Sequence, residues 1–292
     1  MKNKEFNIDG RKINVKFEIN KVTDEILLDI ILKICTDYEP AQHIRNLSIV
    51  ISDEQEPEGW GQVDSNELLK GNNVLIIYYN LFFENGEPIK NFKDELIQTL
   101  EHELVHLWHN QESLEMKKIL EEERKIKLKL YNEVRDFDLE HPKKDLELIS
   151  YNLMTALYLE GIVKYYTHRE KIVFSSQQYS EDYNEVKKQL GISISKFENL
   201  ISSKDKQSFV QNLQDFFPKF DFFIYGKHMV YTILYANPKL TLKDIMKLSY
   251  KKYFELYLES AKKLNYNPLF SWDNNTKFSY GFFRNKINEL EL

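Results

Sequence analysis

Apolar and polar residues alternate with a period of two along much of the N-terminal part of the chain, as in half-buried β-strands. The alternation continues on both sides of Asp9-Gly10, a dipeptide that favours the two-residue turn of a β-hairpin. An amphipathic helix is predicted between Thr23 and Asp37, where apolar residues recur at helical spacing. The predicted strands are EFNI (5–8), RKINVKFEI (11–19), NLSIVIS (46–52) and NNVLIIYYNLFF (72–83).

From Asn91 onward the apolar residues recur every three or four positions, as they do on one face of an α-helix. The charged stretch at 116–141 is interpreted as a solvated helix that ends before Pro142. A long helix is predicted at 144–166, and the remainder is mostly helical, with Thr241 opening a late helix. The later two-thirds of the chain is therefore predicted to be helical.

Together these patterns predict an α+β protein with a small N-terminal β-sheet region and a mostly helical C-terminal half. The sequence divides into a strand-rich subdomain at 1–90 and a helical subdomain at 91–292, which we expect to form one unit. The chain has 292 residues, 42% of them hydrophobic, which is enough for a substantial core.

Charge and cysteine content narrow the expected partners and compartment. The net charge is −6 and no basic stripe is present, so no nucleic-acid partner is expected. No apolar run is long enough to span a membrane, and residues 1–10 lack the apolar segment of a signal peptide. Cys35 is alone on an apolar helical pattern and is expected to be a buried thiol. We therefore expect a soluble, cytoplasmic protein.

The segment TLEHELVHLWHN (99–110) carries the pattern H-E-x-x-H. His102 and His106 are four residues apart, so on a helix they lie one turn apart on one face and can both reach one Zn²⁺ ion. Glu103 projects to the side, where it can hold a metal-bound water without binding the metal. The flanking positions Thr99, Leu100, Leu104, Val105, Leu107 and Trp108 are uncharged, which favours a buried metal-binding helix over a surface helix.

This segment resembles the active-site helix of the zincin metallopeptidases. The resemblance implies a zincin-like catalytic domain, one zinc ion per chain, and hydrolysis of a peptide or protein substrate. Such a site needs a third protein ligand and an open position for water.

Two glutamates compete for the place of the third ligand. Glu160-Gly161-Ile162-Val163-Lys164-Tyr165 resembles the second zinc helix of the gluzincins, which implies that Glu160 is the ligand. Glu160 also lies on an apolar stripe, where a carboxylate needs a cation or strong donors. Glu112 stands at the ligand position of the metzincin pattern, but His109 replaces the glycine of that pattern, so Glu112 is the alternative. His109 itself is predicted to lie at the rim or surface. The stretch between His106 and Glu160 is longer than in the thermolysin-like and aminopeptidase-like gluzincins, which implies an insertion between the two zinc helices.

Further residues are predicted to contact the substrate. In zincins an edge strand above the active-site helix pairs with the extended peptide, and 72–80 fits that role here, with Gly59 and Gly61 at the rim of the cleft. The resemblance also implies a second electrophile for the developing oxyanion, for which Tyr225 and His228 are the candidates. No G-A-M-E-N-like stretch of an aminopeptidase is found, which favours an endopeptidase. The alternatives are a non-catalytic binding or regulatory protein with a zincin fold, and a zinc hydrolase that acts on a non-peptide bond.

Overall fold

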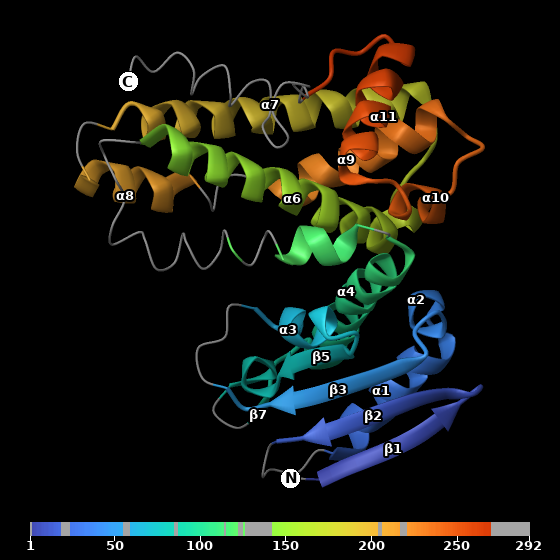
Figure 1. Cartoon of the computed structure of the whole chain (residues 1–292). Coiled ribbons are helices and arrows are strands. Elements are labelled where there is room, and N and C mark those ends of the chain that lie inside the picture. The colour runs from blue at the N-terminus through green and yellow to red at the C-terminus, as the bar shows by residue number, and fades with distance from the viewer. Residues whose placement is uncertain are drawn as a thin grey trace. The chain divides into compact units, whose positions relative to one another are not determined.

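The computed structural model describes residues 2–18, 24–54, 59–84, 87–113, 115–121, 125, 142–203, 206–216 and 221–269. The chain forms two compact units, residues 1–120 and 121–292, and its class is α+β as the sequence predicts (Figure 1). The boundary falls later than residue 90, because the helix that carries the H-E-x-x-H pattern packs against the sheet and belongs to the first unit.

A five-stranded mixed sheet forms the base of the first unit, with the strand order β1-β2-β3-β5-β4. The hairpin at its N-terminus is confirmed: Asp9 and Gly10 both have positive φ, at 50° and 78°, which the tight turn requires. Strands β2, β3 and β5 are parallel, whereas β1 and β4 pair antiparallel with their neighbours. The strands are β1 Lys2–Ile8, β2 Arg11–Phe17, β3 Asn46–Ser52, β4 Gly61–Val63 and β5 Asn73–Tyr78.

The predicted edge strand at 72–80 is wrong. Strand β5 is paired on both sides, by β3 and by β4, so it is an interior strand. Its apolar side chains are buried or half-buried, in keeping with an interior position. The edge is formed by β4, three residues that lie between the predicted strands 46–52 and 72–83, and the short helix α3 (Ser65–Leu69) follows it.

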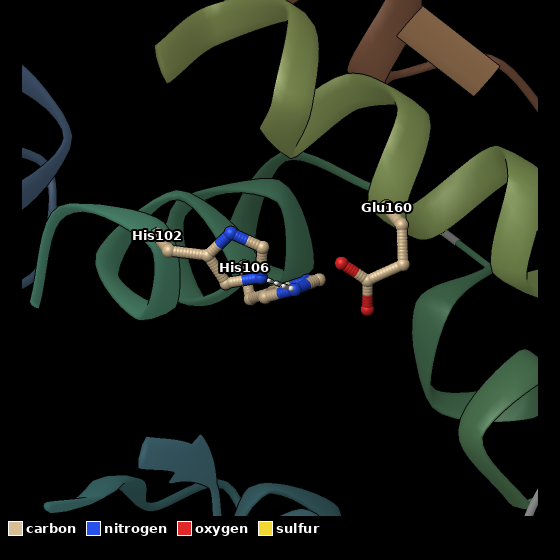
Figure 2. A group of neighbouring side chains, drawn as sticks. All are labelled: His102, His106 and Glu160. Carbon is tan, nitrogen blue, oxygen red and sulfur yellow. Dashed lines mark hydrogen bonds between the residues drawn. The ribbon is translucent and has the colours of Figure 1, made fainter. Parts of the chain in front are cut away.

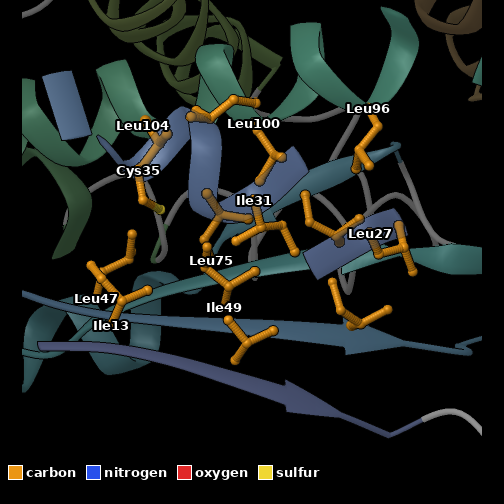
Figure 3. Close-up of a cluster of buried hydrophobic side chains, with 14 of the residues drawn as sticks. Ile13, Leu27, Ile31, Cys35, Leu47, Ile49, Leu75, Leu96, Leu100 and Leu104 are labelled. Carbon is orange, nitrogen blue, oxygen red and sulfur yellow. The ribbon is translucent and has the colours of Figure 1, made fainter. Parts of the chain in front are cut away.

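One face of the sheet is covered by two helices, α1 (Asp24–Asp37) and α4 (Phe92–Glu112) (Figure 3). Ile49 and Leu75 of the sheet meet Ile31 of α1 and Leu100 of α4, and all four side chains are buried. Burying each such side chain contributes about 1.5–3 kcal/mol. The stripe of α4 that faces this core, Leu96, Leu100, Leu104 and Leu107, has the three- to four-residue spacing that the sequence predicts from Asn91 onward.

Arg11 anchors the sheet to the helices of this unit. Its side chain is buried, and Nη1 donates hydrogen bonds to the backbone oxygens of Cys35 (3.0 Å) and Ala41 (2.8 Å). Ala41 belongs to the one-turn helix α2 (Glu39–Gln42). Cys35 is a buried free thiol, as predicted, and burial raises its pKa to about 12. Its thiol is therefore structural and not nucleophilic.

The described part of the second unit is helical, and α9 (Phe222–Ala236) packs against α6, α7 and α11. Thr241 caps α10 through a capping box with Asp244, which confirms the predicted helix start. The predicted helix at 116–141 lies mostly outside the described residues. No helix in the described ranges is long and apolar enough to cross a membrane. The remaining elements are η1 Tyr79–Phe82, β6 Phe83–Glu84, β7 Glu87–Pro88, α6 Pro142–His168, η2 Arg169–Lys171, α7 Ser176–Ile201, α8 Lys206–Phe216, α10 Leu242–Met246 and α11 Tyr250–Lys263.

Candidate metal centre

The packing of α4 on the sheet determines where its histidines point. Each residue of an α-helix advances by about 100°, so a residue two positions after a buried leucine lies roughly 200° around the axis. His102 and His106 stand in this relation to Leu100 and Leu104. They therefore share a face of α4 that is turned away from the sheet, and both side chains are half-buried.

The two imidazole rings converge on one point. His102 Nε2 and His106 Nε2 are 3.2 Å apart, and the ring planes are inclined at 70° (Figure 2). If both nitrogens bound one ion at about 2.0–2.1 Å, the usual zinc–imidazole distance, they would subtend roughly 100° at the metal. That angle is close to tetrahedral, so the pair has the geometry of two ligands of one ion.

Glu160 supplies a carboxylate to the same group. One ligand atom from each of His102, His106 and Glu160 lies within 4.8 Å of the other two, and Figure 2 shows the three side chains pointing toward one another. Two imidazoles and one carboxylate are a common donor set for a catalytic zinc ion. Glu112 is not part of such a group among the described residues. The group can therefore hold a metal ion, and its carboxylate is the one in the E-G-x-x-x-Y segment.

The part of α6 that carries Glu160 crosses α9 at very short distance. Gly161 faces Gly226 of α9, and a Cβ atom added at Gly161 would come within 2.6 Å of the Gly226 backbone. A Cβ atom at Gly226 would meet the backbone oxygen of Leu157 at 2.5 Å. Because backbone atoms cannot move aside as side chains can, both positions require glycine for this crossing. The backbone of the residue after Glu160 is thus held against α9.

Glu103 follows the first histidine and has a buried side chain, with 8% of its surface exposed. A carboxylate at this position adjoins the two histidines on α4 and is largely shielded from solvent. The prediction for His109 is wrong. His109 is fully buried, and so is Val105, which lies one turn earlier on the same face of α4. Burial lowers the pKa of His109 to about 3.

The two candidates for a second electrophile lie in the core of the second unit. The hydroxyl of Tyr225 is 2.8 Å from Ser193 Oγ of α7, and its side chain is fully buried. The ring of His228 stacks on Tyr179 at 5.2 Å and has Tyr183 and Tyr231 as further aromatic neighbours. His228 is not part of the group formed by His102, His106 and Glu160. The structure therefore gives both residues partners within the helical core.

His228 predicts how acid affects stability. Neither of its ring nitrogens has a hydrogen-bond partner in the described part of the chain, and burial, followed by repulsion from Lys227, lowers its pKa to about 3. The unfolded chain, with a histidine pKa of about 6.5, then binds more protons, so stability falls as the pH drops from about 6.5 toward 3. Denaturant titrations at pH 7.5 and 5 should show a smaller loss for His228→Phe than for the wild type. The exposed His43→Gln variant should keep the wild-type loss; an equal loss in His228→Phe would contradict this assignment.

Strand β4 lies directly on the helix that carries the histidines. A Cβ atom added at Gly61 would come within 2.7 Å of Thr99 Cγ2, one turn before the first histidine. Gly61 thus allows β4 to approach α4, and β4 is the outer strand of the sheet on this side. The sequence predicts 72–80 as the edge strand and places Gly59 and Gly61 at the rim. In the structure the edge strand is β4, which begins at Gly61.

Sequence reasoning also missed a group of basic residues that begins one turn after Glu160. Lys164 and His168 follow Glu160 at intervals of four, which places all three on one face of α6. The same spacing rule that selects the two histidines of α4 would have found them.

Neither the family models nor the curated proteins match this sequence, and the fold matches no solved structure. The functional conclusion therefore depends on the geometry of the chain itself.

Proposed function

We propose that this chain is a zinc-dependent peptidase of the gluzincin type. The observation that carries the proposal is the meeting of His102 and His106, from an H-E-x-x-H helix, with Glu160, from an E-G-x-x-x-Y helix. Chance can produce either short pattern in a sequence, but it gives no reason for their donor atoms to converge within 4.8 Å. The donor set fits zinc, and one ion per chain is proposed.

The residues of the site have distinct tasks in this proposal. A zinc ion bound there would lower the pKa of its water to about 7 and polarise the scissile carbonyl. Glu103 would act as the general base toward a water molecule in the site and would return the proton to the leaving amine. The two histidines and Glu160 hold their donor atoms in place. Tyr225 and His228 receive no role in the chemistry, because their observed contacts are to the helical core.

The edge strand β4 is the proposed binding place for the substrate backbone. Among the described residues no further strand pairs with its outer side, and its inner side pairs with β5. An extended peptide can add to such an edge through main-chain hydrogen bonds, which recognise a peptide irrespective of its side chains. The closeness of Gly61 to Thr99 brings this edge to the turn of α4 that precedes His102. Binding along a strand suits an endopeptidase.

A peptide library tests the proposal. Wild-type protein prepared with zinc should cleave some members of a diverse library, as read by mass spectrometry, and should contain about one zinc ion per chain by elemental analysis. A chelator should stop cleavage and added zinc should restore it. The His102→Ala/His106→Ala protein should lack both the zinc and the activity. Undiminished zinc in that variant, or cleavage that a chelator does not affect, would contradict the proposal.

A further inference from the structure

Four basic side chains gather on the second unit next to Glu160. Lys164 and His168 lie on α6, Lys171 ends η2, and Lys227 follows Gly226 on α9. The tight crossing of Gly161 and Gly226 brings the two helices together beside these residues. Both Lys164 and His168 are close enough to Lys171 and Lys227 to be repelled by them. We call Lys164, His168, Lys171 and Lys227 the basic cluster.

The acidic residues near the basic cluster have other tasks. Asp221 attracts Lys164, but its carboxylate caps α9 and accepts a hydrogen bond from Ile224 N at 2.9 Å. Glu160 also attracts Lys164, and in the proposed function its charge is offset by the metal ion. No ion pair within 4.0 Å involves the three lysines in the described ranges of the chain. The three lysines of the basic cluster therefore carry positive charge that their neighbours do not neutralise.

The environment of Lys164 disfavours the charged form of its side chain. Lys164 is half-buried, and its Nζ lies 5.8 Å from the centre of the Phe223 ring. Burial first, and then repulsion from Lys227, lowers its pKa, and burial and repulsion from Lys164 act in the same direction on His168. A bound anion would relieve this repulsion, and a half-buried lysine attracts an anion more strongly than a fully solvated one.

We propose that the basic cluster binds a carboxylate of the peptide substrate and so gives the site a preference for acidic peptides. This inference rests on the proposed function for the position of the scissile bond. Lys164 and His168 lie about 6 Å and 12 Å along the helix axis from Glu160, at 1.5 Å per residue. An extended peptide advances about 3.3 Å per residue, so the carboxylate belongs roughly two to four residues from the scissile bond.

The size of the basic cluster fits a small anionic group better than a polyanion. Nucleic-acid surfaces are broad and strongly basic, whereas this chain has a net charge of −6 and the basic cluster has four members. The carboxylate can come from an aspartate or glutamate side chain or from the C-terminus of the peptide. Both sources share the same recognition chemistry, and they predict different cleavage: an internal cut beside an acidic residue, or removal of C-terminal residues.

Binding measurements with the Glu103→Gln protein test this inference without turnover. The probes are fluorescent peptides in matched pairs: glutamate against glutamine at successive positions, and a free C-terminal carboxylate against an amide. Anisotropy should show at least about tenfold tighter binding of one acidic member, and the preference should decline as salt is added. Lys164→Gln/Lys227→Gln should abolish the preference, whereas Lys188→Gln/Lys239→Gln, which removes two exposed lysines elsewhere, should keep it.

Because Lys164 is half-buried, Lys171→Gln/Lys227→Gln serves as a second variant, and circular dichroism checks the fold of each. Equal binding of both members of every pair, or a preference that persists in both cluster variants, would overturn the inference. So would tighter binding of an RNA homopolymer that the cluster variants abolish. An acidic preference that depends on the basic cluster, found in a protein that neither holds zinc nor cleaves peptides, would support the basic cluster and refute the proposed function.

Discussion

The Glu103→Gln protein is expected to fold, to keep its zinc, and to lose peptide hydrolysis by a factor on the order of 10²–10⁴, the range for general acid–base catalysis. Glutamine has the size and hydrogen-bonding ability of glutamate but cannot accept a proton from the metal-bound water. The side chain of Glu103 is buried, so a substitution of equal size disturbs the packing of α4 little. Cleavage rates of one library substrate, measured with zinc content in the same samples, give the result.

The control is Glu101→Gln on the same helix, one residue before the first histidine, where no role in proton transfer is proposed. It should cleave at nearly the wild-type rate. Equal cleavage by wild type and Glu103→Gln would mean that another group activates the water or that a contaminating protease cleaves the substrate. Zinc loss in Glu103→Gln would instead make Glu103 part of the metal-binding set.

Glu160→Ala is expected to weaken zinc affinity by more than about 100-fold, beyond the 10–100-fold that loss of an outer-shell partner costs. Its carboxylate belongs to the group whose ligand atoms lie within 4.8 Å, and an alanine leaves the two imidazoles with an incomplete ligand set. A competitive titration with a chromogenic chelator measures the affinity. Glu160→Gln extends the test, because an uncharged amide is a much weaker zinc ligand than a carboxylate.

Glu112→Ala is the matched control, since this glutamate lies on α4 and stands at the ligand position of the alternative pattern. Its zinc affinity should stay within about twofold of wild type. The opposite ranking of the two variants would move the third ligand to α4 and remove the gluzincin assignment.

Strongly periodic segments were predictable from sequence. The leucines of α4 recur at helical spacing and are buried against the sheet, and that packing alone determines the face on which His102 and His106 lie. The Asp9-Gly10 turn was equally clear, because both residues adopt the positive φ that few other pairs tolerate. These features depend on local geometry, which a sequence pattern encodes directly.

Features that depend on distant packing were missed or misplaced. Strand β4 has only three residues and no alternating pattern, and pairing with β5 is what makes it a strand. That pairing also turns β5 into an interior strand. The spacing of three residues from His106 carries His109 round the helix and predicts a rim or surface position, yet the side chain is completely buried. The convergence of Glu160 with the histidines followed only from a family resemblance, since no local pattern relates two helices so far apart in sequence.

His102, His106 and Glu160 are proposed to bind one zinc ion, and anomalous diffraction from zinc-loaded crystals can locate that ion. Data recorded on either side of the zinc absorption edge should give one strong peak per chain. It should lie about 2.0–2.1 Å from a nitrogen of each histidine and about 2.0–2.2 Å from a Glu160 oxygen. A peak bound by other residues, or none from protein that is saturated with zinc in solution, would contradict the account.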